Sequence, residues 1–240
     1  EGIALRTRIL KPKFVIPFAS FINFCHVENK FMNEIKADLN KISNLIKKNN
    51  SFPIYLYFNE SWDLKSKKNN DKTILSFEKD FNKKIEFIKS EKIEFELIIE
   101  NCKKSIKRIK NKNNYLFLKF FSTLNIIPKI NFFIFDLNLY CSFNILSGLK
   151  IKNVNENINS YVSLSSDSLN FIFKNEFGFD TLLVNARFSL KNIELKKVIR
   201  GLGVYSFNAS GRYIGFSILG QLKYSFFKEL FKKIFYKSIR

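Results

Sequence analysis

Residues 129–145 read KINFFIFDLNLYCSFNI, and this stretch decides the fold class. Its dense run of β-branched and aromatic residues predicts one or two buried strands. Asp136 and Asn138 interrupt the run, which is also shorter than a helix needs to cross a membrane. Further strands are expected at 13–18, at 54–58 (IYLYF) and within 155–165.

Helical spacing of apolar residues appears on both sides of this stretch, so the sequence predicts a mixed fold, between α/β and α+β. One helix is expected over 28–50, ended by Asn49 and Asn50. A charged helix is expected over 74–110, with room for a break near Ser90. The remaining expectations are a helix capped by Ser165 or Ser166, a strand-like run within 177–190, a short helix over 192–203 stopped by Gly201 and Gly203, and a basic amphipathic helix over 226–240.

The charge is strongly positive, with 41 Lys and Arg against 21 Asp and Glu, a net charge of +20. Such a balance favours contact with nucleic acid or an anionic membrane. The charge is mostly lysine and is scattered along the chain, which fits a solvated surface equally well, whereas arginine clusters with interleaved aromatic residues would argue harder for nucleic acid. A contact with an anionic membrane or another polyanion is therefore expected to be weak.

The cysteines and the chain ends indicate the compartment. Cys25, Cys102 and Cys141 are odd in number and far apart, so they predict no disulfide framework and fit a reducing cytoplasm. No signal peptide is visible. Because the chain begins EGIALRTRIL, without Met, we expect it to be a fragment of a longer protein.

Motifs for common catalytic sites are missing from the sequence. It has no Walker loop, no G-x-S-x-G elbow, no H-E-x-x-H and no dinucleotide fingerprint. His26 is the only histidine, and it cannot form a complete zinc site with three scattered cysteines. The chain alone is therefore not expected to be a metallohydrolase.

The surroundings of His26 carry a more specific signal. In PFASFINFCHVEN, residues 17–29, His26 follows Pro17 by nine positions. The segment LNKISNLIKKNN follows at 39–50, and FKNEFGFDTLLVNARF at 173–188 places Asp180 six residues after Lys174. In this order the three segments resemble the C-terminal region of metallo-β-lactamase-fold proteins related to CMP-N-acetylneuraminate hydroxylase. Residues 60–160 do not align with that family.

The resemblance implies a fold and a division into parts. Residues 1–60 would be the C-terminal remnant of a metallo-β-lactamase-like αββα sandwich. Residues 61–114 would be a charged helical connector, and residues 115–240 a smaller α+β lobe on the substrate side. The front half of such proteins, with its H-x-H-x-D-H motif, and the Rieske iron–sulfur part of the hydroxylase are both absent from this sequence.

The resemblance also implies a site. His26 would be the last ligand of a zinc or iron ion in the full-length protein, where the metal-bound hydroxide attacks the substrate. Glu28 and Asn29 would support that site or touch the substrate, or else they cap a helix. Asp180 and Arg187 would approach an anionic substrate, or else Asp180 caps a turn and Arg187 ends a strand in an ion pair.

Two functions are consistent with these residues. In the first, the chain is the C-terminal fragment of a metal-dependent hydrolase and needs the missing N-terminal half as its partner. Such a fragment would be inactive alone and hold no metal tightly, and its substrate, a small molecule, lipid or sugar nucleotide, stays open. In the second, the chain is a non-catalytic binding module for anionic membrane lipid or nucleic acid. The phenylalanine-rich second half leaves room for a lipid pocket in either case.

Overall fold

The computed structural model describes residues 2–18, 21–34, 38–152 and 158–215. The chain forms two compact units, Glu1–Ile88 and Lys89–Arg240. This division differs from the three expected parts, whose boundaries were placed near residues 60 and 114. The assignment of those parts to a sandwich remnant, a connector and a lobe stays a prediction. No helix within the described ranges is both long and apolar enough to cross a membrane.

The first unit is mostly helical. Its elements are α1 (Gly2–Leu10), β1 (Phe14–Val15), the 3-10 helix η1 (Val27–Glu34), α2 (Leu39–Lys47), β2 (Phe52–Pro53) and α3 (Asp71–Phe81). Strands β1 and β2 form a short parallel pair, and the small core gathers around Leu39, Tyr55 and Phe77. Asp38 caps α2 by accepting a hydrogen bond from the backbone N–H of Lys41. The region 28–50, expected to be one helix, therefore contains η1 and then the separate helix α2.

The strand expected at 54–58 is wrong, because β2 ends at Pro53. The N–H of Ile54 still donates to the Val15 carbonyl of β1 at 2.9 Å, but the backbone at Tyr55 bonds to side chains. The Tyr55 N–H donates to Oδ1 of Asn70 at 2.9 Å, and the Tyr55 carbonyl accepts from the ammonium of Lys68 at 2.6 Å. These bonds hold a buried, extended segment whose pattern resembles that of a strand.

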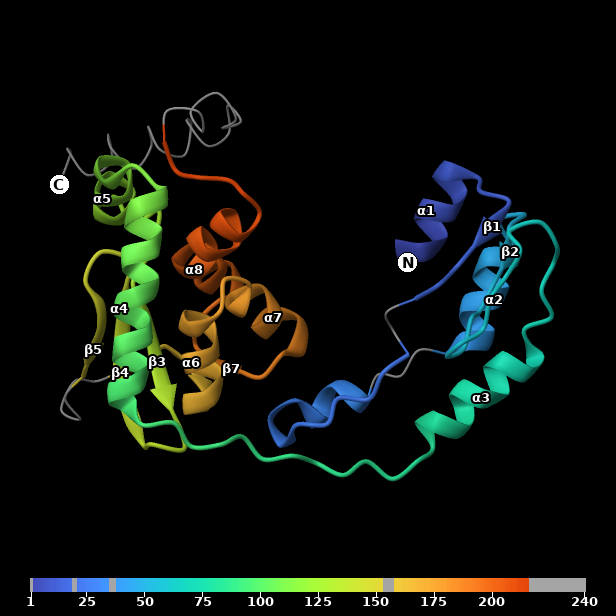
Figure 1. Ribbon diagram of the computed structural model, residues 1–240, viewed down its shortest axis with the longest axis horizontal. Helices are drawn as coiled ribbons and strands as arrows, with labels where there is room; N and C mark the ends of the chain where they lie inside the picture. Colours follow the sequence, from blue (N-terminus) through green and yellow to red (C-terminus); the bar gives the residue numbers. More distant parts are fainter. Residues whose placement is uncertain (1, 19–20, 35–37, 153–157, 216–240) are drawn as a thin grey trace. The chain divides into compact units, whose positions relative to one another are not determined.

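The second unit contains five helices and a five-stranded sheet within its described residues (Figure 1). The helices are α4 (Phe95–Lys112), α5 (Tyr115–Thr123), α6 (Ser166–Lys174), α7 (Gly178–Asn185) and α8 (Leu195–Ala209). The strands are β3 (Ile130–Ile134), β4 (Leu139–Asn144), β5 (Gly148–Ile151), β6 (Tyr161–Leu164) and β7 (Ser189–Lys191). The structure thus confirms a mixed fold of helices and two sheets.

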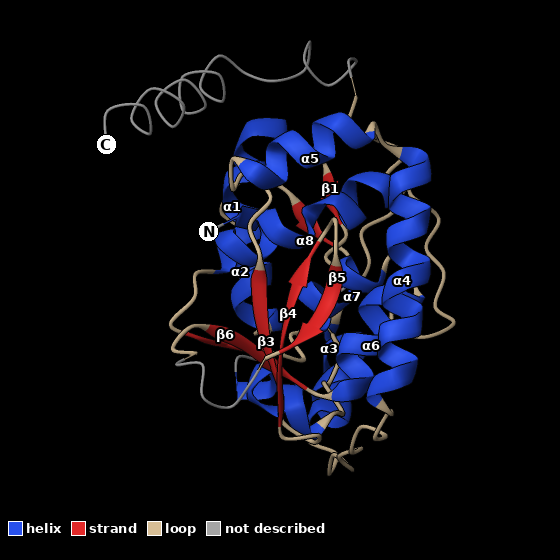
Figure 2. Cartoon of the chain, turned by 90° about the vertical axis from the view of Figure 1, so that its left-hand side faces the viewer, coloured by secondary structure: helices blue, strands red, loops and turns tan. Residues whose placement is uncertain are grey.

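The opening stretch of the sequence becomes the β3–β4 hairpin in the middle of this sheet. The strand order is β5-β4-β3-β6-β7, and only the β3–β6 pair is parallel. Helices α6, α7 and α8 lie to one side of the sheet in Figure 1, and in Figure 2 the strands stand in front of α8. The core therefore fills the helical side, where Ile130, Phe132 and Ile134 of β3 are fully buried.

In this unit the structure confirms one predicted helix start and differs from two other predictions. Ser165 caps α6 through its hydroxyl, which accepts from the N–H of Ser168, as predicted. Helix α8, in contrast, continues through Gly201 and Gly203, where a stop was expected. The prediction of a strand-like run within 177–190 was wrong over its first half, where residues 178–185 form α7.

Two further expectations concern the charged helix over 74–110 and the amphipathic helix over 226–240. The charged pattern of 74–110 splits into α3 and α4, and the break is wider than expected, from residue 82 to 94. Helix α4 belongs to the core of the second unit through residues such as Ile98 and Ile109. The amphipathic helix expected over 226–240 lies outside the described residues.

Candidate functional site

The residues singled out around His26 lie together in one turn of the first unit. Oδ1 of Asn29 accepts from the backbone N–H of His26 at 3.1 Å, and His26 forms a parallel bridge with Ile88. Nδ1 of His26 is buried and has no hydrogen-bond partner within the described part of the chain. Glu28 stands in the first turn of η1 and Asn29 is buried. The polar contacts of Asn29 fit the capping alternative.

Asp180 and Arg187 belong to the second unit and have structural partners there. The hydroxyl of Ser206 donates to Oδ1 of Asp180 at 2.6 Å. Arg187 donates to Oδ2 of Asp167 and to Oγ of Ser90, both at 2.7 Å. These bonds tie α7 to α8, and fix the segment before α4 to the start of α6. The structure thus supports the ion-pair alternative for Arg187.

Metal coordination needs several ligands in one place, and the described residues do not offer them. They contain no cluster of three or more His, Cys, Asp or Glu side chains. A structural zinc ion takes four such ligands and a catalytic one takes three. His26 alone therefore does not fit a complete metal site.

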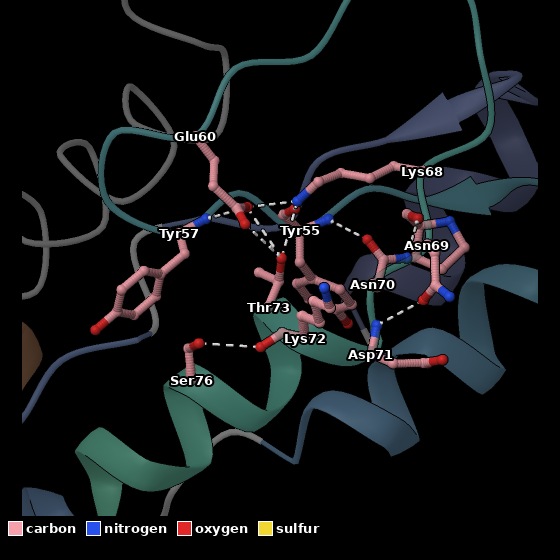
Figure 3. Close-up of polar contacts among 11 residues, drawn as sticks. Tyr55, Tyr57, Glu60, Lys68, Asn69, Asn70, Asp71, Lys72, Thr73 and Ser76 are labelled. Carbon is pink, nitrogen blue, oxygen red and sulfur yellow. Dashed lines mark hydrogen bonds and ion pairs between the residues drawn. The ribbon is translucent and has the colours of Figure 1, made fainter.

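A denser polar cluster surrounds Lys68 in the first unit (Figure 3). Its ammonium donates to the carboxylate of Glu60, to the Tyr55 carbonyl, and to Oγ1 of Thr73 at 2.8 Å. The carboxylate also accepts from the backbone N–H of Tyr57 at 2.9 Å. The bond from Lys68 is the main reason why the pKa of Glu60 is lowered. Every donor here is matched by an acceptor, so we assign the cluster to closure of the loop between β2 and α3.

The strongest candidate for a binding surface is the sheet face of the second unit that lies opposite its core, named here the open face. Strand alternation and cross-strand register place twelve positions on it. They are Lys129, Asn131, Phe133, Tyr140, Ser142, Asn144, Lys150, Lys152, Tyr161, Ser163, Ser189 and Lys191. None of the twelve is acidic, and in Figure 2 the strands β3 and β4 are seen from this side.

Three half-buried aromatic rings form the centre of the open face, and we name Phe133, Tyr140 and Tyr161 the aromatic triad. The rings of Phe133 and Tyr140 stack with their centroids 4.6 Å apart. Tyr161 meets Phe133 at 5.8 Å and Tyr140 at 5.3 Å, in both cases edge to face. A hydrogen bond between the two tyrosine hydroxyls raises the pKa of Tyr140. The three rings thus hold each other in place without help from the core.

Lysines border the triad on the side of β4 and β5, and we name Lys129, Lys150 and Lys152 the lysine flank. Lys150 lies opposite Ser142, and the N–H of Lys152 donates to the Tyr140 carbonyl at 2.9 Å. The pKa of Lys129 is lowered by partial desolvation and by the neighbouring charges of Lys152 and Lys150. The three ammonium groups therefore repel one another and favour an anionic ligand.

The sequence contained a signal for this surface that was not recognised. Phe132 and Phe133 are adjacent, so alternation sends one ring to the core and the other to the open face. The polar residues Lys129 and Asn131 alternate with Ile130 and Ile134, so this pattern already places Phe132 on the apolar face and Phe133 on the polar one. Lys150 and Lys152, two residues apart, carried the matching signal of one charged strand face.

The twelve positions named for the open face can stack planar groups and attract anions, and they include no acidic side chain and no imidazole. The chain matches no protein-family model, no curated protein and no solved structure.

Proposed function

We propose that the second unit binds single-stranded nucleic acid across the open face of its sheet. The observation that carries this proposal is the aromatic triad with the lysine flank beside it, on a face whose twelve described positions include no carboxylate. Bases would stack on the rings, and phosphates would lie along the lysines.

The expected stacking energy and salt dependence are consistent with such a complex. Base–aromatic stacking contributes about 1–3 kcal/mol per base, independently of sequence, because every base has a π-face. The ammonium groups of Lys129 and Lys150 would release counterions when they meet phosphates, with a salt slope of about −0.7 for each contact on a single strand. Together the two contributions predict weak to moderate, strongly salt-dependent binding.

A single strand fits the open face better than the alternative ligands do. Paired bases in a duplex do not expose their faces to a sheet, whereas a single strand does. Membrane anchors present protruding apolar side chains, but the triad rings are half-buried and two of them carry hydroxyls. We therefore assign the polyanion contact expected from composition to nucleic acid and not to lipid.

Fluorescence anisotropy with a labelled oligothymidylate tests the proposal on the full chain. We expect binding at low salt, weaker competition by duplex DNA, and a loss of about fivefold or more for each of F133L and Y161L, since one stacked base contributes at least about 1 kcal/mol. F207L removes an exposed ring on α8, away from the open face, and is expected to leave the affinity unchanged.

Two results would overturn this function. One is an oligonucleotide affinity that ignores the triad variants. The other is flotation with phosphatidylserine vesicles that requires the triad while oligonucleotides do not bind, which would assign the face to membrane lipid.

His26 supports a second candidate, the hydrolase fragment implied by the resemblance. Its buried Nδ1 has no partner within the described residues, as expected of a ligand whose metal site is completed by other residues. On this proposal residues 1–60 are the remnant of the metallo-β-lactamase-like sandwich, and a zinc or iron ion binds tightly only in the full-length protein. The substrate and the N-terminal half are part of the same proposal.

Metal analysis after equilibrium dialysis of the chain tests this candidate. We expect weak zinc or iron binding that drops further in H26A. Stoichiometric binding at nanomolar affinity by this chain alone, unchanged in H26A, would contradict the proposal that His26 is one ligand of a divided site.

A further inference from the structure

A groove of about 410 Å³ lies between α4 and the β4–β5 turn. Its floor is apolar and includes Ile106, Leu146 and Leu149, and Gly148 forms part of its wall. Gly148 has a φ of +80°, and an added Cβ would lie 3.2 Å from the end of Ile106. The turn therefore approaches the helix closely, and Figure 1 shows α4 and β5 side by side.

One side of the groove carries a row of lysines. Lys103, Lys107 and Lys110 line it, at i, i+4 and i+7 of α4, so they share one helix face. Seven residues of helix span about 10 Å, enough for the row to follow an extended anionic backbone. Lys110 also lies 5.6 Å from the centre of the Tyr115 ring. None of the groove residues is acidic.

The carboxylate nearest to this row along the helix is already neutralised elsewhere. Glu100 pairs with Lys104 at 2.6 Å, and Lys104 is not a groove residue. The positive charge of the row is therefore not balanced from within α4 at the groove.

Strand β5 connects the groove with the open face. Gly148 and Leu149 line the groove, while Lys150 lies on the open face. Because β5 is the edge of the sheet, no further strand separates the lysine flank from the lysine row of α4 among the described elements.

We infer that the α4 groove is the second half of the nucleic-acid site, where a strand stacked on the aromatic triad crosses the edge strand β5 and lays its phosphates along Lys103, Lys107 and Lys110. This inference rests on the proposed function of the open face, and it adds the path and length of the ligand. The apolar floor leaves room for one base or sugar to be buried beneath the lysines.

Oligothymidylates of two lengths test the inference by anisotropy on the full chain, one of about 4 nucleotides and one of about 12, which span known site sizes. The short probe covers the triad only. We expect the triple variant K103Q/K107Q/K110Q to weaken the long probe by about tenfold or more and to reduce its salt slope by about 2, since each lost phosphate contact removes about 0.7. The short probe should be unchanged within about twofold, and K107Q alone should remove about a third of the slope change.

The charge-matched control is K72Q/K174Q/K196Q, which removes three lysines that do not line the groove and keeps the Glu100–Lys104 pair intact. It should leave both probes nearly unchanged. Equal losses on both probes, equal losses in the control, or no loss on the long probe would each overturn the groove inference alone, because the short probe still reports on the triad. If neither probe binds the unaltered chain, the proposed function fails and the inference fails with it.

Discussion

Phe133 and Tyr140 are cross-strand partners on β3 and β4, and their rings stack 4.6 Å apart with planes inclined by 30°. The pair lies on the sheet face opposite the core, although the neighbouring Phe132 is fully buried. An aromatic cross-strand pair stabilises a sheet by only about 0.2–1 kcal/mol. The ring surface is therefore available for binding at little cost in stability.

Tyr140 distinguishes stacking from hydrogen bonding. We expect Y140F to keep oligonucleotide affinity within about twofold, because the ring remains, and Y140L to lose about 1–3 kcal/mol of binding. Both variants should lose less than about 1 kcal/mol of stability. Anisotropy and thermal unfolding measured on the same samples check this, and a Y140F variant as weak as Y140L would assign the role to the hydroxyl.

We expect the charge of Lys129 to favour polyanion binding and to disfavour folding. Its pKa is lower in the folded chain than in the unfolded one, so its charge disfavours folding below the folded pKa, and this penalty is relieved as pH rises toward the unfolded value. K129Q should therefore leave the melting temperature unchanged or higher at neutral pH while weakening polyanion binding. The gain in stability of K129Q, which comes from relieving the repulsion by Lys150 and Lys152, should shrink in high salt, and a clear loss of stability in K129Q would contradict this reading.

Two glycines of α8 form a matched pair. A Cβ at Gly201 would lie 2.4 Å from Cγ1 of Ile130 and 2.9 Å from the Pro128 carbonyl, whereas Gly203 has nothing within 4 Å. We expect G201A to destabilise the second unit by about 1–3 kcal/mol through overpacking, and G203A to stabilise it by up to about 1 kcal/mol. Denaturant titration distinguishes them, and equal effects would show that α8 does not approach β3 so closely.

The three thiols should differ in reactivity. Burial raises the pKa of Cys102 and of Cys141 to about 12, whereas Cys25 is exposed. Because the thiolate is the reactive form, Ellman's reagent at neutral pH should modify one thiol rapidly and the other two only when the second unit unfolds. Peptide mapping identifies the site, and rapid labelling of Cys141 in the folded chain would contradict the buried hairpin.

Lys68 should stabilise the first unit. K68M takes the ammonium group away from the Tyr55 carbonyl and from the Glu60 carboxylate, so we expect a loss of about 1–3 kcal/mol. The lowered pKa of Glu60 means that its contribution is present above the unfolded pKa and is lost as the pH falls through the folded value. Acid unfolding of the unaltered chain should therefore be more pH-dependent than that of K68M, and oligonucleotide binding should not change.

The sequence by itself determined the elements whose signals are local. The strands β3 and β4 follow from β-branched and aromatic residues, where one or two strands were predicted, and the start of α6 follows from the hydroxyl of Ser165. The mixed fold class follows from both periodicities together. These predictions were confirmed because propensity and capping act within a few residues of each other along the chain.

Long-range packing decided the rest. The strand-like residues 54–58 form no strand, and Tyr55 bonds to the side chains of Asn70 and Lys68. Gly201 lies inside α8 and not at its end, because the helix packs closely on Ile130 at this position. The open face arose in the same way, because the register of β3 with β4 placed Phe133 opposite Tyr140. A shift by one residue exchanges the two faces of a strand, so only tertiary structure could bring the aromatic triad and the lysine flank together.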